Sequence, residues 1–283
     1  MIITMTSIAL TPLLSWLMVV RWDMGAEGAA WAGIITQGFR GAALLMALFA
    51  SRWGLAFSLV GWDETKILLR QMVPLVWPLF VTELLFSSGS FLFALLIERI
   101  GTRQLAVYQI SGTLEGVFLM LSIGFNSAST ILVSQAIGRG DAKGVWEISR
   151  GIWHLVLLVS VLAGLLFALM GFGLPVFFPN TSVQVHQWGL WAIALNALFL
   201  PIKNSNMTFF GTLAAGGDTR FLLLSDVITV FLVGLPLAYI LAFPLGLGLW
   251  GVFLGRLLGE ELVRISMFLW RYRSGKWFKI SNE

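Results

Sequence analysis

The chain has 283 residues, of which 58% are hydrophobic and 11% are charged, and its mean hydropathy is +0.89. Soluble domains carry about 25% charged residues, so this composition predicts an integral membrane protein in contact with a lipid bilayer. The absence of cysteine excludes disulfides, thiolate metal sites and a cysteine nucleophile. The net charge of +4 comes mostly from Lys and Arg in short loops between apolar runs, which indicates membrane topology rather than nucleic-acid binding.

Apolar runs divide the chain into about eight segments, and this pattern predicts an all-α, polytopic bundle of about eight transmembrane helices. In chain order the segments span residues 1–20, 27–50, 71–97, 104–136, 152–178, 184–213, 220–245 and 248–271. Eleven Lys and Arg residues lie in one set of loops and the C-terminus, whereas the other set carries only Arg21, Arg99 and Arg103. The positive-inside rule therefore places both termini in the cytoplasm.

The first two segments resemble the last two. Pro12 is followed after thirteen residues by GAEG at 25–28, and Pro236 is followed after twelve residues by GLWG at 248–251. Transporters are often built from such internal repeats. The pattern predicts that residues 1–50 are the end of one copy and residues 65–271 a complete second copy, with four helices of the first copy missing at the N-terminus.

The longest polar break in the chain follows the second segment. Charged residues alternate there with Ile67, Leu68 and Leu69, as in a short amphipathic helix that lies on the membrane surface. The predicted domains are therefore residues 1–52, a cytoplasmic connector at 53–70 and a helical domain at 71–283.

A carboxylate lies deep inside the third segment, residues 71–97. Glu83 is twelve residues into it, which places the side chain roughly 18 Å deep in a helix, near the membrane midplane. Phe80 and Ser87 share its face at spacings of three and four. Acidic residues at this depth most often serve function, so the stripe predicts the wall of a transport pathway. The alternative is a carboxylate bound in a structural pair.

Two prolines, Pro74 and Pro78, lie one turn apart at the entrance of the same segment. Each removes a backbone donor and opens the helix, which a membrane tolerates only where other groups satisfy the freed carbonyls. The pair predicts a hinge.

Further polar residues lie within other apolar segments. Gln109 and Glu115 are in the fourth, and Asn196, Lys203 and Asn206 share one face of the sixth. If these helices are neighbours, the residues that line one water-filled cavity are Glu83, Gln109, Glu115, Lys203 and Asn206. Lys203 is then a counter-ion for a carboxylate. A purely structural Lys–Glu pair is the alternative.

The last segment carries charges of a different kind. Arg256, Glu260 and Arg264 are spaced by four and are expected to pair along their own helix in a structural role. His154 and His186 have no partners at catalytic or metal-ligand spacing. No arrangement typical of hydrolytic catalysis is present, so we expect neither an enzyme nor a cofactor beyond a coupling ion.

Several stretches resemble the multidrug and toxic compound extrusion (MATE) transporters. They are GAEGAAWAG at 25–33, residues 105–145, PIKNSNMTFFGTLAAGGDTRF at 201–221, GLGLWGVFLGRLLGEELVR at 246–264 and WRYRSGKW at 270–277. The resemblance implies a fold with two six-helix lobes. In it, residues 1–50 correspond to helices five and six, the last two of the N-terminal lobe. Residues 71–271 correspond to the complete six-helix C-terminal lobe, and the chain is N-terminally truncated.

The same resemblance implies a function. MATE transporters are antiporters that take up H⁺ or Na⁺ and export organic, often cationic, drug-like compounds, here across a bacterial cytoplasmic membrane. The family's cation-binding acid in helix seven falls on Glu83, which would then be the ligand of the coupling ion, Na⁺ included. Near the place where the resemblance puts the helix-five acid of some members, this sequence has Thr11 before Pro12.

Two other functions remain open. A lipid-precursor flippase of the same superfamily would have several basic residues in its cavity, whereas here acids outnumber Lys203. A non-transporting membrane fragment, which needs a missing N-terminal half as its partner, is the second alternative.

Overall fold

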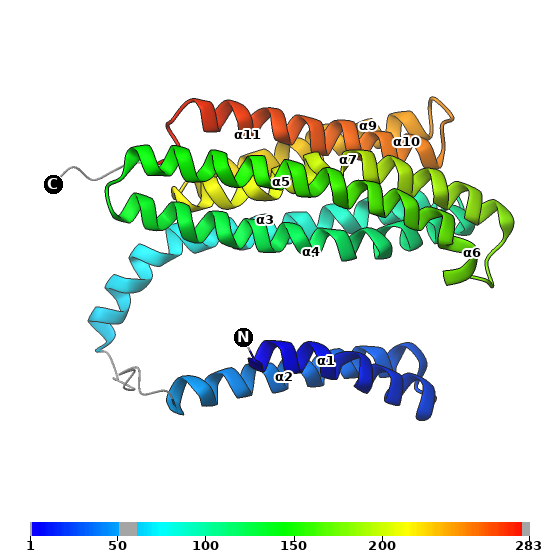
Figure 1. The fold of residues 1–283 in the computed structure, drawn as a ribbon, viewed down its shortest axis with the longest axis horizontal. Coiled ribbons are helices and arrows are strands. Elements are labelled where there is room, and N and C mark those ends of the chain that lie inside the picture. The colour runs from blue at the N-terminus through cyan, green and yellow to red at the C-terminus, as the bar shows by residue number, and fades with distance from the viewer. Residues whose placement is uncertain (1, 51–60, 279–283) are drawn as a thin grey trace. The chain divides into compact units, whose positions relative to one another are not determined.

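The computed structural model describes residues 2–50 and 61–278, and within these ranges the chain is helical with no strands (Figure 1). The predicted all-α class is therefore confirmed. The chain forms two compact units, Met1–Ile67 and Leu68–Glu283. Their boundary falls inside the predicted connector at 53–70, of which residues 53–60 lie outside the described residues.

The first unit is a helical hairpin. Helix α1 (Ile2–Trp16) continues into a π-helical turn, η1 (Leu17–Arg21), and helix α2 (Gly25–Ala50) returns alongside it. Gly25 begins α2 with φ of 56°. A Cβ atom on Gly28 would lie only 3.0 Å from the Met18 carbonyl, so this glycine permits the close approach of the two helices.

The second unit contains the remaining helices (Figure 1). They are α3 (Trp62–Glu98, whose first turns precede Leu68), α4 (Thr102–Gly138), α5 (Ala142–Met170), η2 (Gly171–Gly173), α6 (Leu174–Phe177), α7 (Val183–Ala215), α8 (Thr219–Asp226), η3 (Val227–Gly234), α9 (Leu235–Ala242), α10 (Leu249–Leu254), η4 (Gly255–Leu262) and α11 (Val263–Arg273). Helix α7 packs against both α4 and α5 and forms the centre of the unit. The segments η3 and η4 are π-helical, and they pack against each other.

Five stretches of the described helices are long and apolar enough to cross a membrane. They are Val76–Glu98, Thr102–Gly138, Ala142–Phe177, Val183–Ala215 and Thr219–Ala242, with Leu10–Arg21 as a shorter apolar helix. The predicted segment at 248–271 is helical but more polar than expected, because Arg256, Glu260, Glu261 and Arg264 lie near its middle. All four make polar contacts inside the protein, as described below.

A stripe of small residues joins the two last long helical stretches. Gly251 and Gly255 face Ala242 and Ala238, and Gly259 faces Gly234. A Cβ atom on Gly255 would lie 2.3 Å from the Cα of Ala238. Close backbone approach through small residues is a common way in which membrane helices associate. The stripe therefore fixes the stretch 249–273 against the stretch 219–242.

The turn that precedes this stripe has the geometry of the turn in the first unit. Gly248 has φ of 54°, close to the 56° of Gly25. A Cβ atom on Gly251 would lie 2.5 Å from the backbone of Ala242, as one on Gly28 would contact the backbone of Met18. In both copies of the predicted repeat, the first glycine makes the turn and the second permits contact between backbones.

Gly255→Ala tests the stripe. The added methyl group would collide with main-chain atoms, and overpacking of this kind costs about 1–3 kcal/mol of unfolding free energy. Gly124→Ala is the matched control, because no atom lies within 4 Å of the added Cβ in α4 and alanine there should stabilise by up to about 1 kcal/mol. Thermal unfolding in detergent micelles measures both. Equal stability of the two variants would contradict the close approach.

Candidate functional site

A cavity of about 230 Å³ opens among five helices of the second unit. Its wall is mixed, with two carboxylates, one guanidinium and two amides set among aromatic rings. The lining residues are Thr82, Glu83 and Phe86 from α3, Asn126 from α4, Asn206, Met207 and Phe210 from α7, Asp226 from α8, and Arg264 and Phe268 from α11. Charged and aromatic groups therefore face the same small space.

Two oxygen atoms of this wall have no hydrogen-bond partner among the described residues. Thr82 Oγ1 and Asn206 Oδ1 are buried, and neither makes a hydrogen bond within the part of the chain that the structure describes. Buried polar atoms are nearly always paired, with protein, water or ligand. Together with the carboxylates of Glu83 and Asp226, they give the cavity the capacity to hold water or a bound cation.

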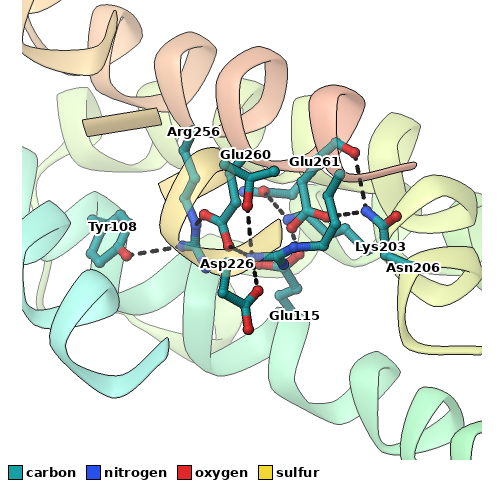
Figure 2. Close-up of polar contacts among 11 residues, drawn as sticks. Tyr108, Glu115, Lys203, Asn206, Asp226, Arg256, Glu260 and Glu261 are labelled. Carbon is teal, nitrogen blue, oxygen red and sulfur yellow. Dashed lines mark hydrogen bonds and ion pairs between the residues drawn. The ribbon is translucent and has the colours of Figure 1, made fainter. Parts of the chain in front are cut away.

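A continuous ionic network runs from the cavity into the protein (Figure 2). Arg264 lies 2.9 Å from Asp226 on the neighbouring helix and 3.3 Å from Glu260 on its own. Glu260 lies 3.4 Å from Arg256, whose guanidinium donates a 2.9 Å hydrogen bond to the hydroxyl of Tyr108. The expected pairing along one helix is therefore confirmed, and the structure adds a pair between helices, Arg264–Asp226.

Further polar contacts involve Glu115 of α4 and Lys203 and Asn206 of α7 (Figure 2). Lys203 is paired with Glu115 and donates a 2.8 Å hydrogen bond to Asn196 Oδ1. Asn206 donates from Nδ2 to the Glu261 carboxylate at 2.8 Å and to the Glu261 main-chain oxygen at 3.1 Å. Asn206 thus both lines the cavity and contacts a buried acid.

The structure separates the residues that the sequence predicted together. Glu83 and Asn206 line the cavity. Glu115 and Lys203 are buried as an ion pair and do not line the cavity. The carboxylate that Lys203 pairs with is therefore Glu115. Phe80, Ser87 and Gln109 are exposed and do not line this cavity. Their roles in substrate binding stay predictions.

The predicted hinge lies within one helix. Pro74 is exposed and Pro78 is buried, and α3 is continuous from Trp62 to Glu98 around both. The opposite end of α3 is anchored, because Phe93 and Ile97 are buried in an apolar cluster with Val230. Glu83 lies between these two regions, and its side chain is exposed.

Sequence reasoning missed three features of the site. Asn126 has no charged residue of its helix at a spacing of three or four that would have singled it out, and Glu261 was overlooked because its neighbour Glu260 has the spacing of four from Arg256 and Arg264. The pairing of Asp226 with Arg264 joins residues 38 positions apart, so no local spacing could reveal it. One sequence signal was available for the last pair: Asp226 is the one acid within the segment at 220–245, so its counter-ion was to be expected from another segment.

Lys203→Met tests the buried pair. It removes the ammonium group and leaves Glu115 buried without its cation, so we expect the unfolding free energy to fall by about 3–5 kcal/mol. The double variant Lys203→Met/Glu115→Gln removes both charges and should recover most of this loss. Denaturation in detergent, followed by tryptophan fluorescence, measures all three variants. A double variant that is as unstable as the single one would argue against the pairing.

Comparison with known proteins places this geometry in a family. The MatE family model matches residues 78–240. The chain is 28% identical over 263 residues to a probable multidrug resistance protein NorM of Thermotoga maritima, covering 91% of this chain and 55% of that protein. It is 30% identical over 219 residues to a probable NorM of Bradyrhizobium diazoefficiens, covering 76% of this chain and 46% of the relative. The chain thus spans about half the length of these curated relatives.

Solved structures share the fold. An outward-facing multidrug resistance MATE family transporter superposes with a TM-score of 0.81 at 17% identity, covering 95% of this chain and 60% of that one. The Vibrio cholerae MATE transporter VcmN in its bent form gives a TM-score of 0.75 at 18% identity, covering 98% and 63%. With five apolar spans, the protein is an integral, multi-pass membrane protein. Because the family match covers more than half of its residues, the chain belongs to the MatE family.

Proposed function

We propose that this protein serves multidrug efflux, as a cation-coupled antiporter that exports organic, often cationic, drug-like compounds across a bacterial cytoplasmic membrane. The observation that carries the proposal is the cavity, in which Glu83 and Asp226 face aromatic rings. Two carboxylates exceed the one guanidinium of Arg264, so the wall favours a positively charged occupant. The rings of Phe86, Phe210 and Phe268 offer faces to an organic cation. The relatives are named probable multidrug resistance proteins, which supports a role in multidrug efflux.

Exchange requires that substrate and coupling ion compete for one negative charge. Glu83 suits this role, because it is a cavity carboxylate that is exposed and forms no ion pair among the described residues. A proton needs only its carboxylate oxygen. Na⁺ would need further oxygen donors, which Thr82, Asn206 and Asp226 could supply. Within the described residues no group of three or more acidic or histidine side chains could hold a metal ion, so Na⁺ would depend on the neutral oxygens of Thr82 and Asn206 as well as on carboxylates.

The position of Glu83 on α3 supports a moving site. The half of α3 beyond Gly89 is anchored, since a Cβ on Gly89 would lie 2.5 Å from Val230. The half with Pro74 and Pro78 lacks backbone donors at both prolines. Bending at the prolines would move Glu83 relative to Asp226, which lies on a different helix.

The balance of charge in the cavity favours an exporter of cations over a lipid-precursor flippase. A flippase would bind anionic phosphate groups and would need several basic residues. Arg264 is the one basic residue among the ten that line the cavity, and it is already paired with Asp226 and Glu260.

Glu83→Gln tests the proposed exchange site. It keeps the side-chain shape and removes the charge, so we expect the affinity for a fluorescent organic cation to fall at least tenfold, equivalent to about 1.4 kcal/mol. Acid pH or Na⁺ should compete with the dye in the parent protein and no longer in the variant. Quenching of tryptophan fluorescence on the purified chain measures binding, and dye efflux from a pump-deficient host measures transport.

Glu147→Gln is the matched control, because Glu147 is an exposed acid that pairs with Lys143 on the surface of α5. It should bind dye like the parent. Unchanged affinity and unchanged competition in Glu83→Gln would assign this acid a structural role.

The proposed orientation, with both termini in the cytoplasm, is tested with single cysteines. The parent has none, so it provides an unlabelled background. Gln184 and Ser274 are exposed and lie near opposite ends of helices, at the start of α7 and just after α11. With an impermeant maleimide on intact cells, we expect Gln184→Cys to label and Ser274→Cys to label only after lysis. Labelling of both from the same side would refute this orientation.

A further inference from the structure

A second carboxylate, that of Glu261, has no ionic partner among the described residues, and it is more buried in the protein than that of Glu83. Glu261 is twelve residues from Leu249 and twelve from Arg273, at the midpoint of the last helical stretch. Its exposed fraction is 6%. The other three acids of the buried network, Glu115, Asp226 and Glu260, each pair with a cation, whereas Glu261 forms no ion pair with any described residue.

The basic side chains near Glu261 form ion pairs with other acids. Lys203 on α7 is held by Glu115 of α4 and by Asn196. Arg264 on α11 is shared by Asp226 of α8 and Glu260. Arg256, on the same segment as Glu261, is held by Glu260 and Tyr108. The charges that act on Glu261 are those of Glu260, Arg264 and Lys203. Four acids thus share three cations, and Glu83 of α3 adds a further acid on the cavity side.

Ionisation of Glu261 would leave an uncompensated negative charge at the middle of a membrane protein. The Asn206 amide donates a neutral hydrogen bond at 2.8 Å, which is much weaker compensation than an ion pair. A buried acid without a counter-ion is stable when it is neutral. The carboxylate is buried and faces a donor, Asn206 Nδ2, rather than further oxygen atoms that a metal ion would need, so a proton is the ligand that fits.

We propose that Glu261 is a proton-binding site of the C-terminal half of the chain, separate from Glu83. An O–H bond forms on the carboxylate, and the proton is taken from and returned to water that reaches the cavity. Asn206 connects the cavity with Glu261, because it lines the cavity and its Nδ2 donates a hydrogen bond to the Glu261 carboxylate (Figure 2). The site lies on the π-helical segment η4, and such segments are frequent at functional sites.

Asn206 also links cavity occupancy to this proton. Its Oδ1 is buried and makes no hydrogen bond with any described residue. A cation that binds at Oδ1 polarises the amide and makes Nδ2 a stronger donor to Glu261, which favours the ionised carboxylate. Binding of a cation in the cavity then releases the Glu261 proton, and uptake of the proton releases the cation. Asn206 is a positioning residue in this scheme.

Infrared difference spectroscopy of the purified chain tests the proposal without any transport step. A protonated carboxylic acid has a carbonyl stretch that is resolved from that of a carboxylate, and ¹³C-labelled glutamate identifies it. We expect a band of a protonated Glu at neutral pH that weakens when tetraphenylphosphonium is added. The band should be absent in Glu261→Gln and retained in Glu83→Gln and in the surface control Glu147→Gln.

Each alternative result is decisive. Absence of a protonated Glu band in the parent, or a band that persists unchanged in Glu261→Gln, would overturn the site. If Glu261→Gln does not yield folded protein, Glu261→Asp takes its place, and the labelled Glu band must vanish there too. Asn206→Ala should keep the band and lose its response to tetraphenylphosphonium. Loss of dye binding in Glu83→Gln with the Glu261 band intact would show that Glu261 holds its proton whether or not Glu83 carries a charge.

Discussion

The constraint on which the second unit depends is the compensation of charge inside a membrane. Six acidic or basic residues described between α4 and α11 are at most 8% exposed: Glu115, Lys203, Asp226, Glu260, Glu261 and Arg264. Lipid supplies no hydrogen bonds, so every one of these groups must find its partner in another part of the protein. The ion pairs Lys203–Glu115 and Arg264–Asp226 each join two helices. Removal of one member would strand the other, which ties the positions of α4, α7, α8 and α11 together.

Such pairs form only where helices approach closely, and glycines in the backbone permit this approach. The glycines at 251, 255 and 259 remove the side chains that would separate the last helical stretch from α9 and η3. The chain becomes π-helical in both partners within this contact, since Gly255 and Gly259 lie in η4 and Gly234 lies in η3. A π turn contains one more residue than an α turn and so rotates the side chains that follow it. Arg264 can therefore face Asp226 at 2.9 Å while Glu261 faces Asn206.

The same backbone explains what the sequence could and could not predict. The all-α class, the membrane setting and the cavity position of Glu83 follow from hydrophobic runs and from the depth of one acid within them. The i,i+4 pairs of Arg256, Glu260 and Arg264 were also predictable, because they depend on local spacing. Glu261 was not, since its contact is with the Asn206 side chain of another helix, 55 residues away in the sequence. Lys203 could be matched to an acid but not to Glu115 in particular, because 88 residues separate them.

Two glutamates of one chain thus have different environments, and environment decides what each can do. Glu83 is exposed at the cavity on a helix that carries two prolines, so its charge is open to ions that enter from water. Glu261 lies on a helix fixed by glycine contacts, and among the described residues its side-chain hydrogen bond to the cavity wall is with the Asn206 amide. An accessible acid suits exchange between large and small cations, whereas an enclosed acid admits only the smallest. The pattern resembles other proteins in which environment gives two carboxyl groups distinct roles. Here Asn206, held between cavity and buried acid, is the residue through which the two charges can influence each other.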